Sequence, residues 1–172
     1  MNAACEKIDK IAFLYFMKFQ FINIGKPHDV ALKNAIEDFS KRINNYYAVE
    51  WLIMPPVKNA ASLSETELKK QEGKIILNKI SKEDFLILLD ETGKQLNSIE
   101  LAKFIEQKTN EARSIIFLIG GAFGVSDEIK QRANFIWSLS KLVFPHMVVR
   151  LILAEQVYRA CTILRNEKYH HV

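Results

Sequence analysis

The hydrophobic positions of the chain alternate between two periods. Residues 18–24 alternate apolar and polar side chains, as a strand does, and residues 85–89 and 114–119 are almost continuously apolar. Continuous apolar strands are typical of a parallel sheet that is covered on both faces. Further strands are expected over 48–54 and 135–140, with helices over 29–46, from Ser62 or Ser64 to 80, and over 97–110, 126–133 and 148–165. This alternation predicts an α/β fold with a parallel sheet.

Local end signals support these boundaries. Pro55 and Pro56 follow the second strand and lack the N–H groups that a strand ladder needs. Ser62 and Ser64 each stand three residues before a glutamate, and Asn97 also precedes a glutamate by three, which is the pattern of a capping box.

Composition narrows the class of protein. With 172 residues, 49% of them hydrophobic and 26% charged, the chain is expected to be one globular domain rather than disordered or fibrous. The net charge of +4 favours an anionic partner such as nucleic acid. Two cysteines, Cys5 and Cys161, neither staple such a domain nor hold zinc alone, which indicates a reduced, cytoplasmic protein. No apolar run reaches membrane-spanning length, and the four histidines lack metal-ligand spacing, so neither a membrane partner nor a metal is expected.

Three loops that follow predicted strands are candidates for chemistry, because ligands of parallel sheets bind at the carboxyl ends of the strands. The first contains the glycine-rich run 120–124, whose spacing matches neither a dinucleotide fingerprint nor a phosphate-binding loop. A tight turn is the alternative interpretation. The second loop holds Asp90 and Glu91, whose adjacency in a strand predicts opposite faces. Here the alternative is a solvated turn with Gly93 at positive φ. The third, 139–146, ends at His146, which either holds a phosphate or caps the next helix.

The last helix is apolar over most of its circumference, so it is expected to be buried in a core or against a second copy of the chain, with a dimer interface favoured. Cys161 within it is expected to pack rather than react. From residue 141 onward basic side chains outnumber acidic ones, which favours phosphate contacts. The basic residues are Lys141, Arg150, Arg159, Arg165 and Lys168.

Several motifs occur in a fixed order along the chain. They are Gly-Lys after the first strand, Leu-Asp after the third, I-G-G-x-x-G, the run W-S-L-S-K-L-x-F-P-H over 137–146, E-Q-V-Y-R-A over 155–160, and a closing Tyr-His. Together they resemble the SPOUT-class ribosomal RNA large-subunit methyltransferase H family, over about residues 17–172.

The resemblance implies an α/β fold with a deep C-terminal trefoil knot, a single domain over 17–172, and a homodimer. It implies an enzyme that uses S-adenosyl-L-methionine, without a metal, to methylate N3 of a pseudouridine in a 23S rRNA hairpin facing the small subunit. The substrate would be the assembled 70S ribosome, with no DNA partner. The cofactor contacts would be Leu89, Gly120, Leu139, Ser140, Lys141, Leu142, Val143 and Phe144.

The resemblance also implies roles for the tail. Tyr169 and His170 would reach the active site, with His170 as the favoured catalytic group, while His146 and Arg150 would position a phosphate or the base. Two departures stand out: His171 occupies a position where the family commonly has arginine, and residues 1–16 precede the family's start. We expect that extension to be poorly ordered or merely packed on the surface.

Two other functions remain open from sequence. One is a tRNA methyltransferase of the same class, which would share the cofactor loops but not the Tyr-His tail. The other is an RNA-binding or ribosome-assembly module that kept the fold without catalysis.

Overall fold

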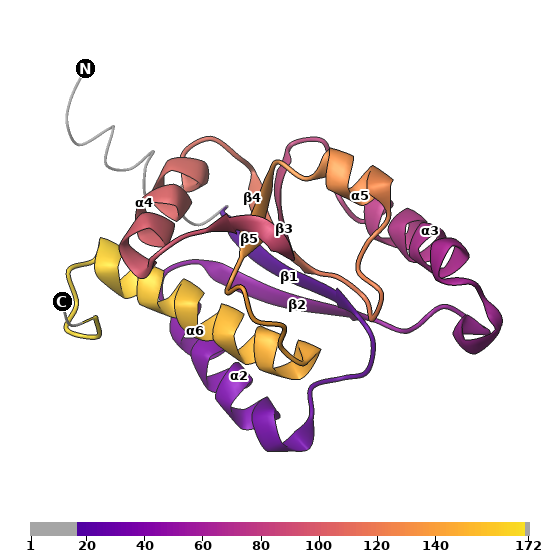
Figure 1. The fold of residues 1–172 in the computed structure, drawn as a ribbon. Helices are drawn as coiled ribbons and strands as arrows, with labels where there is room; N and C mark the ends of the chain where they lie inside the picture. The colour runs from indigo at the N-terminus through magenta and orange to yellow at the C-terminus, as the bar shows by residue number, and fades with distance from the viewer. Residues whose placement is uncertain (1–16, 171–172) are drawn as a thin grey trace.

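The computed structural model describes residues 17–170, so the expectations for residues 1–16 and for His171 lie outside the described part of the chain. Five strands form one parallel sheet in the order β2-β1-β4-β3-β5 (Figure 1). This confirms the predicted α/β class. The strands are β1 (Lys18–Ile24), β2 (Ala48–Met54), β3 (Asp84–Gln95), β4 (Ser114–Ile119) and β5 (Phe135–Ser138). The helices are α2 (Val30–Ile43), η1 (Ala60–Ser62), α3 (Glu65–Leu77), α4 (Ser98–Thr109), α5 (Asp127–Arg132) and α6 (His146–Leu164).

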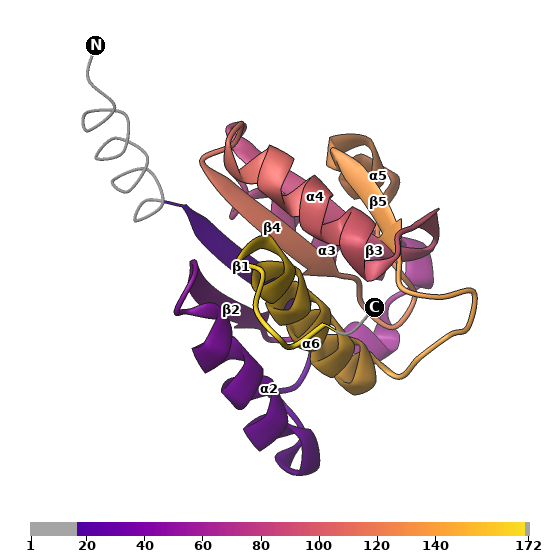
Figure 2. The same cartoon turned by 90° about the vertical axis from the view of Figure 1, so that its left-hand side faces the viewer.

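Helices cover both faces of the sheet (Figures 1 and 2). The chain moves toward the β2 edge through α2 and α4, and toward the β5 edge through α3 and α5. Crossover connections between parallel strands are right-handed. Two crossovers that run in opposite directions across the sheet therefore place their helices on opposite faces. The last helix, α6, lies between α2 and α4 and contacts both.

Each face has its own hydrophobic core. Phe19 and Phe117 of the sheet pack with Leu153 of α6 on one face, while Leu118 packs with Ile129 of α5 on the other. All six residues of β4, the central strand, are buried. Burial on both faces therefore explains the continuous apolar run that predicted this strand.

The predicted helix ends are close to those observed. The Ser64 side chain accepts a hydrogen bond from the Glu67 N–H and begins α3, whereas Ser62 belongs to the short η1. Asn97 forms the expected capping box with Glu100. Helix α6 begins at His146, two residues earlier than predicted, and its N-cap residue is Pro145, so the interpretation of His146 as a cap is wrong.

The largest difference from the sequence prediction is in β3. The strand does not stop at Leu89 but continues to Gln95, and after a register shift Lys94 pairs with Trp137 of β5. The solvated turn at Gly93 is therefore wrong: among the described glycines, the positive φ values belong to other positions. Gly93 instead lies against the β5 backbone, where an added Cβ would be 2.7 Å from the Ile136 carbonyl oxygen.

No helix within residues 17–170 is both long and apolar enough to cross a membrane. The trefoil knot that the resemblance implies stays a prediction.

Candidate active site

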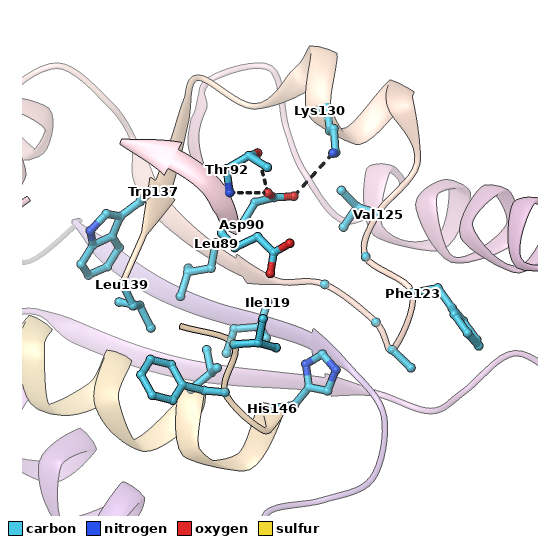
Figure 3. Close-up of a pocket in the computed structure, with 18 of the residues that line it drawn as sticks. Leu89, Asp90, Thr92, Ile119, Phe123, Val125, Lys130, Trp137, Leu139 and His146 are labelled. Carbon is cyan, nitrogen blue, oxygen red and sulfur yellow. Dashed lines mark hydrogen bonds and ion pairs between the residues drawn. The ribbon is translucent and has the colours of Figure 1, made fainter. Parts of the chain in front are cut away.

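A cavity of about 640 Å³ opens at the carboxyl ends of β3, β4 and β5 (Figure 3). Its volume is typical of a small-molecule site. The three loops predicted from sequence converge here, because β3 pairs with both β4 and β5 and the strands are parallel. Seven of the eight expected cofactor residues line the cavity: Leu89, Gly120, Leu139, Ser140, Leu142, Val143 and Phe144. The eighth, Lys141, is exposed on the same loop but is not among the lining residues.

The glycine loop after β4 forms one wall. The Gly124 N–H donates to the Gly121 carbonyl over 2.9 Å, and Gly124 has a φ of +84°, a conformation that L side chains rarely adopt. At Gly120 an added Cβ would come within 3.1 Å of Val125. The run is thus a tight turn and a cavity wall at once, so the two interpretations of the sequence do not exclude each other.

The irregular part of β3 after Leu89, which the sequence had predicted as a loop, holds a fixed carboxylate. Asp90 Oδ1 accepts hydrogen bonds from the Thr92 N–H at 2.9 Å and from Thr92 Oγ1 at 2.6 Å, and Lys130 Nζ lies 3.5 Å from Oδ2 (Figure 3). Burial alone would raise the pKa of Asp90, but these partners outweigh it and lower the pKa. Asp90 is therefore ionised at neutral pH, while its neighbour Glu91 lines the cavity and is exposed.

The loop before α6 supplies an apolar wall and a histidine. The Ser140 side chain accepts a hydrogen bond from the Leu142 N–H at 3.0 Å, which shapes the loop. Leu142 and Val143 are 68% and 80% exposed, so part of this wall is open to solvent. His146 lines the cavity, and burial together with the nearby Arg150 charge lowers its pKa. His146 is therefore neutral at physiological pH.

Arg150 lies one helical turn after His146 but faces a different part of the molecule. Its side chain is 2% exposed, and Nη1 donates to the Lys26 carbonyl at 3.0 Å and lies 3.4 Å from His28 Nδ1. Burial lowers its pKa, and no carboxylate within residues 17–170 pairs with it. Arg150 therefore ties α6 to the β1–α2 loop, and it does not line the cavity.

The described part of the tail folds back onto α6 (Figure 2). The Tyr169 hydroxyl donates to Glu155 Oε1 at 3.1 Å, and the Arg159 guanidinium lies 4.7 Å from the Tyr169 ring centroid. His170 Nδ1 is 3.5 Å from Arg159 Nη1. Burial and the Glu155 carboxylate raise the pKa of Tyr169. Glu155 is nine residues after His146, about 14 Å along the helix axis, and neither tail residue lines the cavity of its own chain.

One face of α6 is left outside the core. Leu153 and Val157 are fully buried, whereas Val148, Leu151 and Ile152 are only half-buried and do not join either core cluster. We call these three residues, with Glu155 and Arg159, the outer face of α6. Cys161 is buried, and burial raises the pKa of its thiol to about 12, in line with its predicted packing role.

Sequence reasoning missed several residues of the cavity. Lys130 reaches Asp90 from α5, and Glu65 and Lys69 reach the cavity from α3. No local pattern connects these positions with the three loops, because the helices meet the cavity only through the tertiary fold. Among residues 17–170, no three His, Cys, Asp or Glu side chains form a group that could hold a metal ion.

The parallel sheet with a cavity at its carboxyl edge defines an α/β protein with a small-molecule site, and comparison identifies its family. The family model described as "Predicted SPOUT methyltransferase" matches residues 17–170. The chain belongs to the SPOUT methyltransferase family and is a methyltransferase. This confirms the resemblance seen in the motifs and favours an enzyme over a module without catalysis.

Individual relatives within the family are similar to the chain over nearly its whole length. The chain is 46% identical over 156 residues to the ribosomal RNA large subunit methyltransferase H of Cytophaga hutchinsonii, covering 90% of this chain and 100% of that protein. It is 42% identical to the protein of that name from Flavobacterium johnsoniae, covering 90% of this chain and 99% of the relative. For the protein of that name from Trichlorobacter lovleyi the identity is 38%, covering 90% and 100%.

Proposed function

We propose that this protein transfers a methyl group from S-adenosyl-L-methionine to N3 of a pseudouridine in the 23S rRNA hairpin that faces the small subunit. It acts on the assembled 70S ribosome, in the cytoplasm, as a homodimer. The observation that carries this proposal is the convergence of the expected cofactor residues on one cavity. The names of the full-length relatives support the large-subunit rRNA as the substrate.

The cavity suits a cationic sulfonium compound. Its charged lining consists of four acidic side chains (Glu65, Asp90, Glu91, Asp127) and two basic ones (Lys69, Lys130). An excess of negative charge attracts a cation. Leu89, Leu139 and Phe144 offer apolar contacts, and the backbone groups of the three loops can bind the edges of an adenine ring.

When bound, S-adenosyl-L-methionine would supply an electrophilic methyl group on a positively charged sulfonium, and the product without that group would carry one positive charge less. The negative lining therefore favours the charged reactant over the neutral product, which assists product release. The remaining work of the protein is to hold the acceptor nitrogen in line with the methyl group and to exclude water.

The acceptor nitrogen must lose its imide proton before or during the attack. His146 lines the cavity in its neutral form and is available to accept a proton or to orient the base. We assign a second catalytic role at the acceptor nitrogen to His170, and we assign to Tyr169 the role of holding the tail in place. Arg150 holds the Lys26 carbonyl, and its charge acts on His146, so its role is to position the start of α6 against the β1–α2 loop.

The position of the tail supports a homodimer. Tyr169 contacts Glu155, about 14 Å along the axis of α6 from His146, and His170 lies beside Arg159, about 20 Å along the axis. We therefore propose that each cavity is completed by the tail of a second copy. The outer face of α6 is the surface for that copy. It combines half-buried Val148, Leu151 and Ile152 with the tail-binding residues Glu155 and Arg159.

Labelled-methyl transfer tests this function. Purified protein and S-adenosyl-L-methionine are incubated with 70S ribosomes, separate subunits or tRNA from cells lacking the modification, and the product nucleoside is identified by mass spectrometry. Label at N3 of one pseudouridine, on 70S ribosomes, is the expected result. Activity on tRNA with none on ribosomes would instead identify the tRNA methyltransferase alternative. Light scattering gives the oligomeric state.

A further inference from the structure

Helix α3 carries a buried carboxylate that the proposed reaction does not use. Glu72 is 8% exposed, its carboxylate oxygens keep some contact with solvent, and no hydrogen bond or ion pair to them occurs among residues 17–170. Burial raises its pKa, and no neighbouring charge offsets this effect. A buried carboxylate without a partner destabilises a protein. Stability alone therefore does not account for a glutamate at this position.

The surroundings of Glu72 lead directly to the cavity. A Cβ added to Gly121 would lie 2.5 Å from Glu72 Oε2, and a Cβ added to the adjacent Gly73 would lie 2.5 Å from Ser126 Oγ. Two glycines thus allow α3 and the glycine loop to touch, one on each side of the contact. Gly121 also lines the cavity. The carboxylate and the cavity therefore contact the same short loop.

We propose that Glu72 is a positioning residue for the cofactor cavity, acting through the backbone of Gly121; this inference rests on the proposed function. A carboxylate placed against a loop attracts its N–H groups and repels its carbonyl oxygens. The Gly121 carbonyl already accepts the Gly124 N–H, so the effect falls on the other peptide groups of the loop: it favours a conformation in which their N–H groups face α3 and their carbonyl oxygens face the cavity. Carbonyl oxygens on that side accept hydrogen bonds from an adenine amino group and stabilise a sulfonium charge.

A positioning role and a structural role predict different results. A residue that only supports the fold loses stability and ligand affinity together when it is replaced. At Glu72, stability and cofactor affinity are expected to respond differently. Removing an unpaired buried charge removes the free-energy cost of burying it, so stability does not fall. The same change removes the electric field on the loop, so affinity falls. Glu72→Gln is the sharpest variant, since it keeps the size of the side chain and removes only the charge.

The experiment measures S-adenosyl-L-methionine binding by titration calorimetry and the melting temperature of the full chain. Glu72→Gln should weaken binding roughly tenfold and leave the melting temperature equal to or above that of the parent protein. Glu72→Ala should bind more weakly still, because the amide of Glu72→Gln keeps the size of the side chain and a dipole beside the loop, and alanine keeps neither. The matched control is Glu67→Gln, an exposed position on the same helix whose carboxylate accepts a hydrogen bond from Gln71, and it should change neither quantity.

Two results would overturn the inference: a Glu72→Gln protein that binds the cofactor as tightly as the parent, or one in which affinity and melting temperature fall together. A parent protein that does not bind S-adenosyl-L-methionine at all would overturn the proposed function itself, and the inference with it. The parent titration thus separates the two failures.

Discussion

Replacing Gly93 by alanine tests whether close packing of β3 on β5 holds the cavity together. An added Cβ would lie 2.7 Å from the Ile136 carbonyl carbon and oxygen and 2.8 Å from the Trp137 carbonyl carbon. All three are backbone atoms of β5, so no side-chain rotation relieves the contact. Because carbon atoms pack at about 3.5–4.0 Å, the two strands would have to separate by roughly 1 Å.

The cost follows from that separation. Overpacking in a core costs about 1–3 kcal/mol, and each ladder hydrogen bond that weakens adds about 0.5–1.5 kcal/mol. We therefore expect the free energy of unfolding to fall by about 2–4 kcal/mol, which for a domain of this size lowers the melting temperature by roughly 5–15 °C. Since β5 leads into the loop before α6, cofactor affinity should fall as well.

Urea denaturation followed by tryptophan fluorescence measures the first effect, and calorimetric titration of the cofactor measures the second. Gly124→Ala is the comparison for stability. An added Cβ there has no atom within 4 Å, so only the strain of its φ of +84° remains, about 1–2 kcal/mol. An unchanged unfolding free energy for Gly93→Ala would refute the reasoning, because the clash with β5 cannot be avoided without moving a strand.

Three further predictions concern the tail, the outer face of α6 and the histidines. Deleting residues 169–172 should abolish methyl transfer while cofactor affinity stays nearly unchanged; parallel loss of both would make the tail structural. Ile152→Glu should give a folded monomer by light scattering, whereas Leu153→Glu should unfold the chain, and a dimeric Ile152→Glu protein would contradict the interface. Burial and Arg150 lower the pKa of His28 and His146, so below about pH 6.5 the unfolded chain binds more protons than the folded one. The free energy of unfolding should therefore fall from pH 7.5 to 5.5, and asparagine at either histidine should flatten this slope.

The sequence predicted those parts of the fold that have a local cause. All of β4 is buried by helices on both sides, and that burial requires the apolar run that is visible in the sequence. Asn97 caps α4 through side-chain contacts within four residues. The extension of β3 had no such signal. Asp90, Glu91, Thr92 and Gly93 have the composition of a turn. Only the renewed pairing of Lys94 and Gln95 with β5, more than forty residues later, continues the strand past them.

The site also contains residues that the sequence could locate and residues that depend on the tertiary fold. Parallel strands place their carboxyl ends at one edge, so the three loops could be located from strand order alone, and the family resemblance added the individual cofactor residues. Lys130 could not be found in this way, because its contact with Asp90 depends on where α5 packs. Glu72 could not be found either. In the sequence it is one charged residue among many on α3, and only its burial against Gly121 sets it apart.

Helix α6 shows why an apolar pattern alone did not separate core from interface. The helix is apolar nearly all round, and the sequence left burial in the core and burial against a second copy as alternatives. In the structure one side, with Leu153 and Val157, is the core of the domain, and the outer face remains half-buried. His146 begins the helix at the cavity, and Tyr169 returns to its middle at Glu155. If two copies pack through the outer face, dimer formation also completes the active site. The reason is that α6 contributes core residues on one side and the proposed interface on the other, begins at the cavity with His146, and holds the tail near its middle.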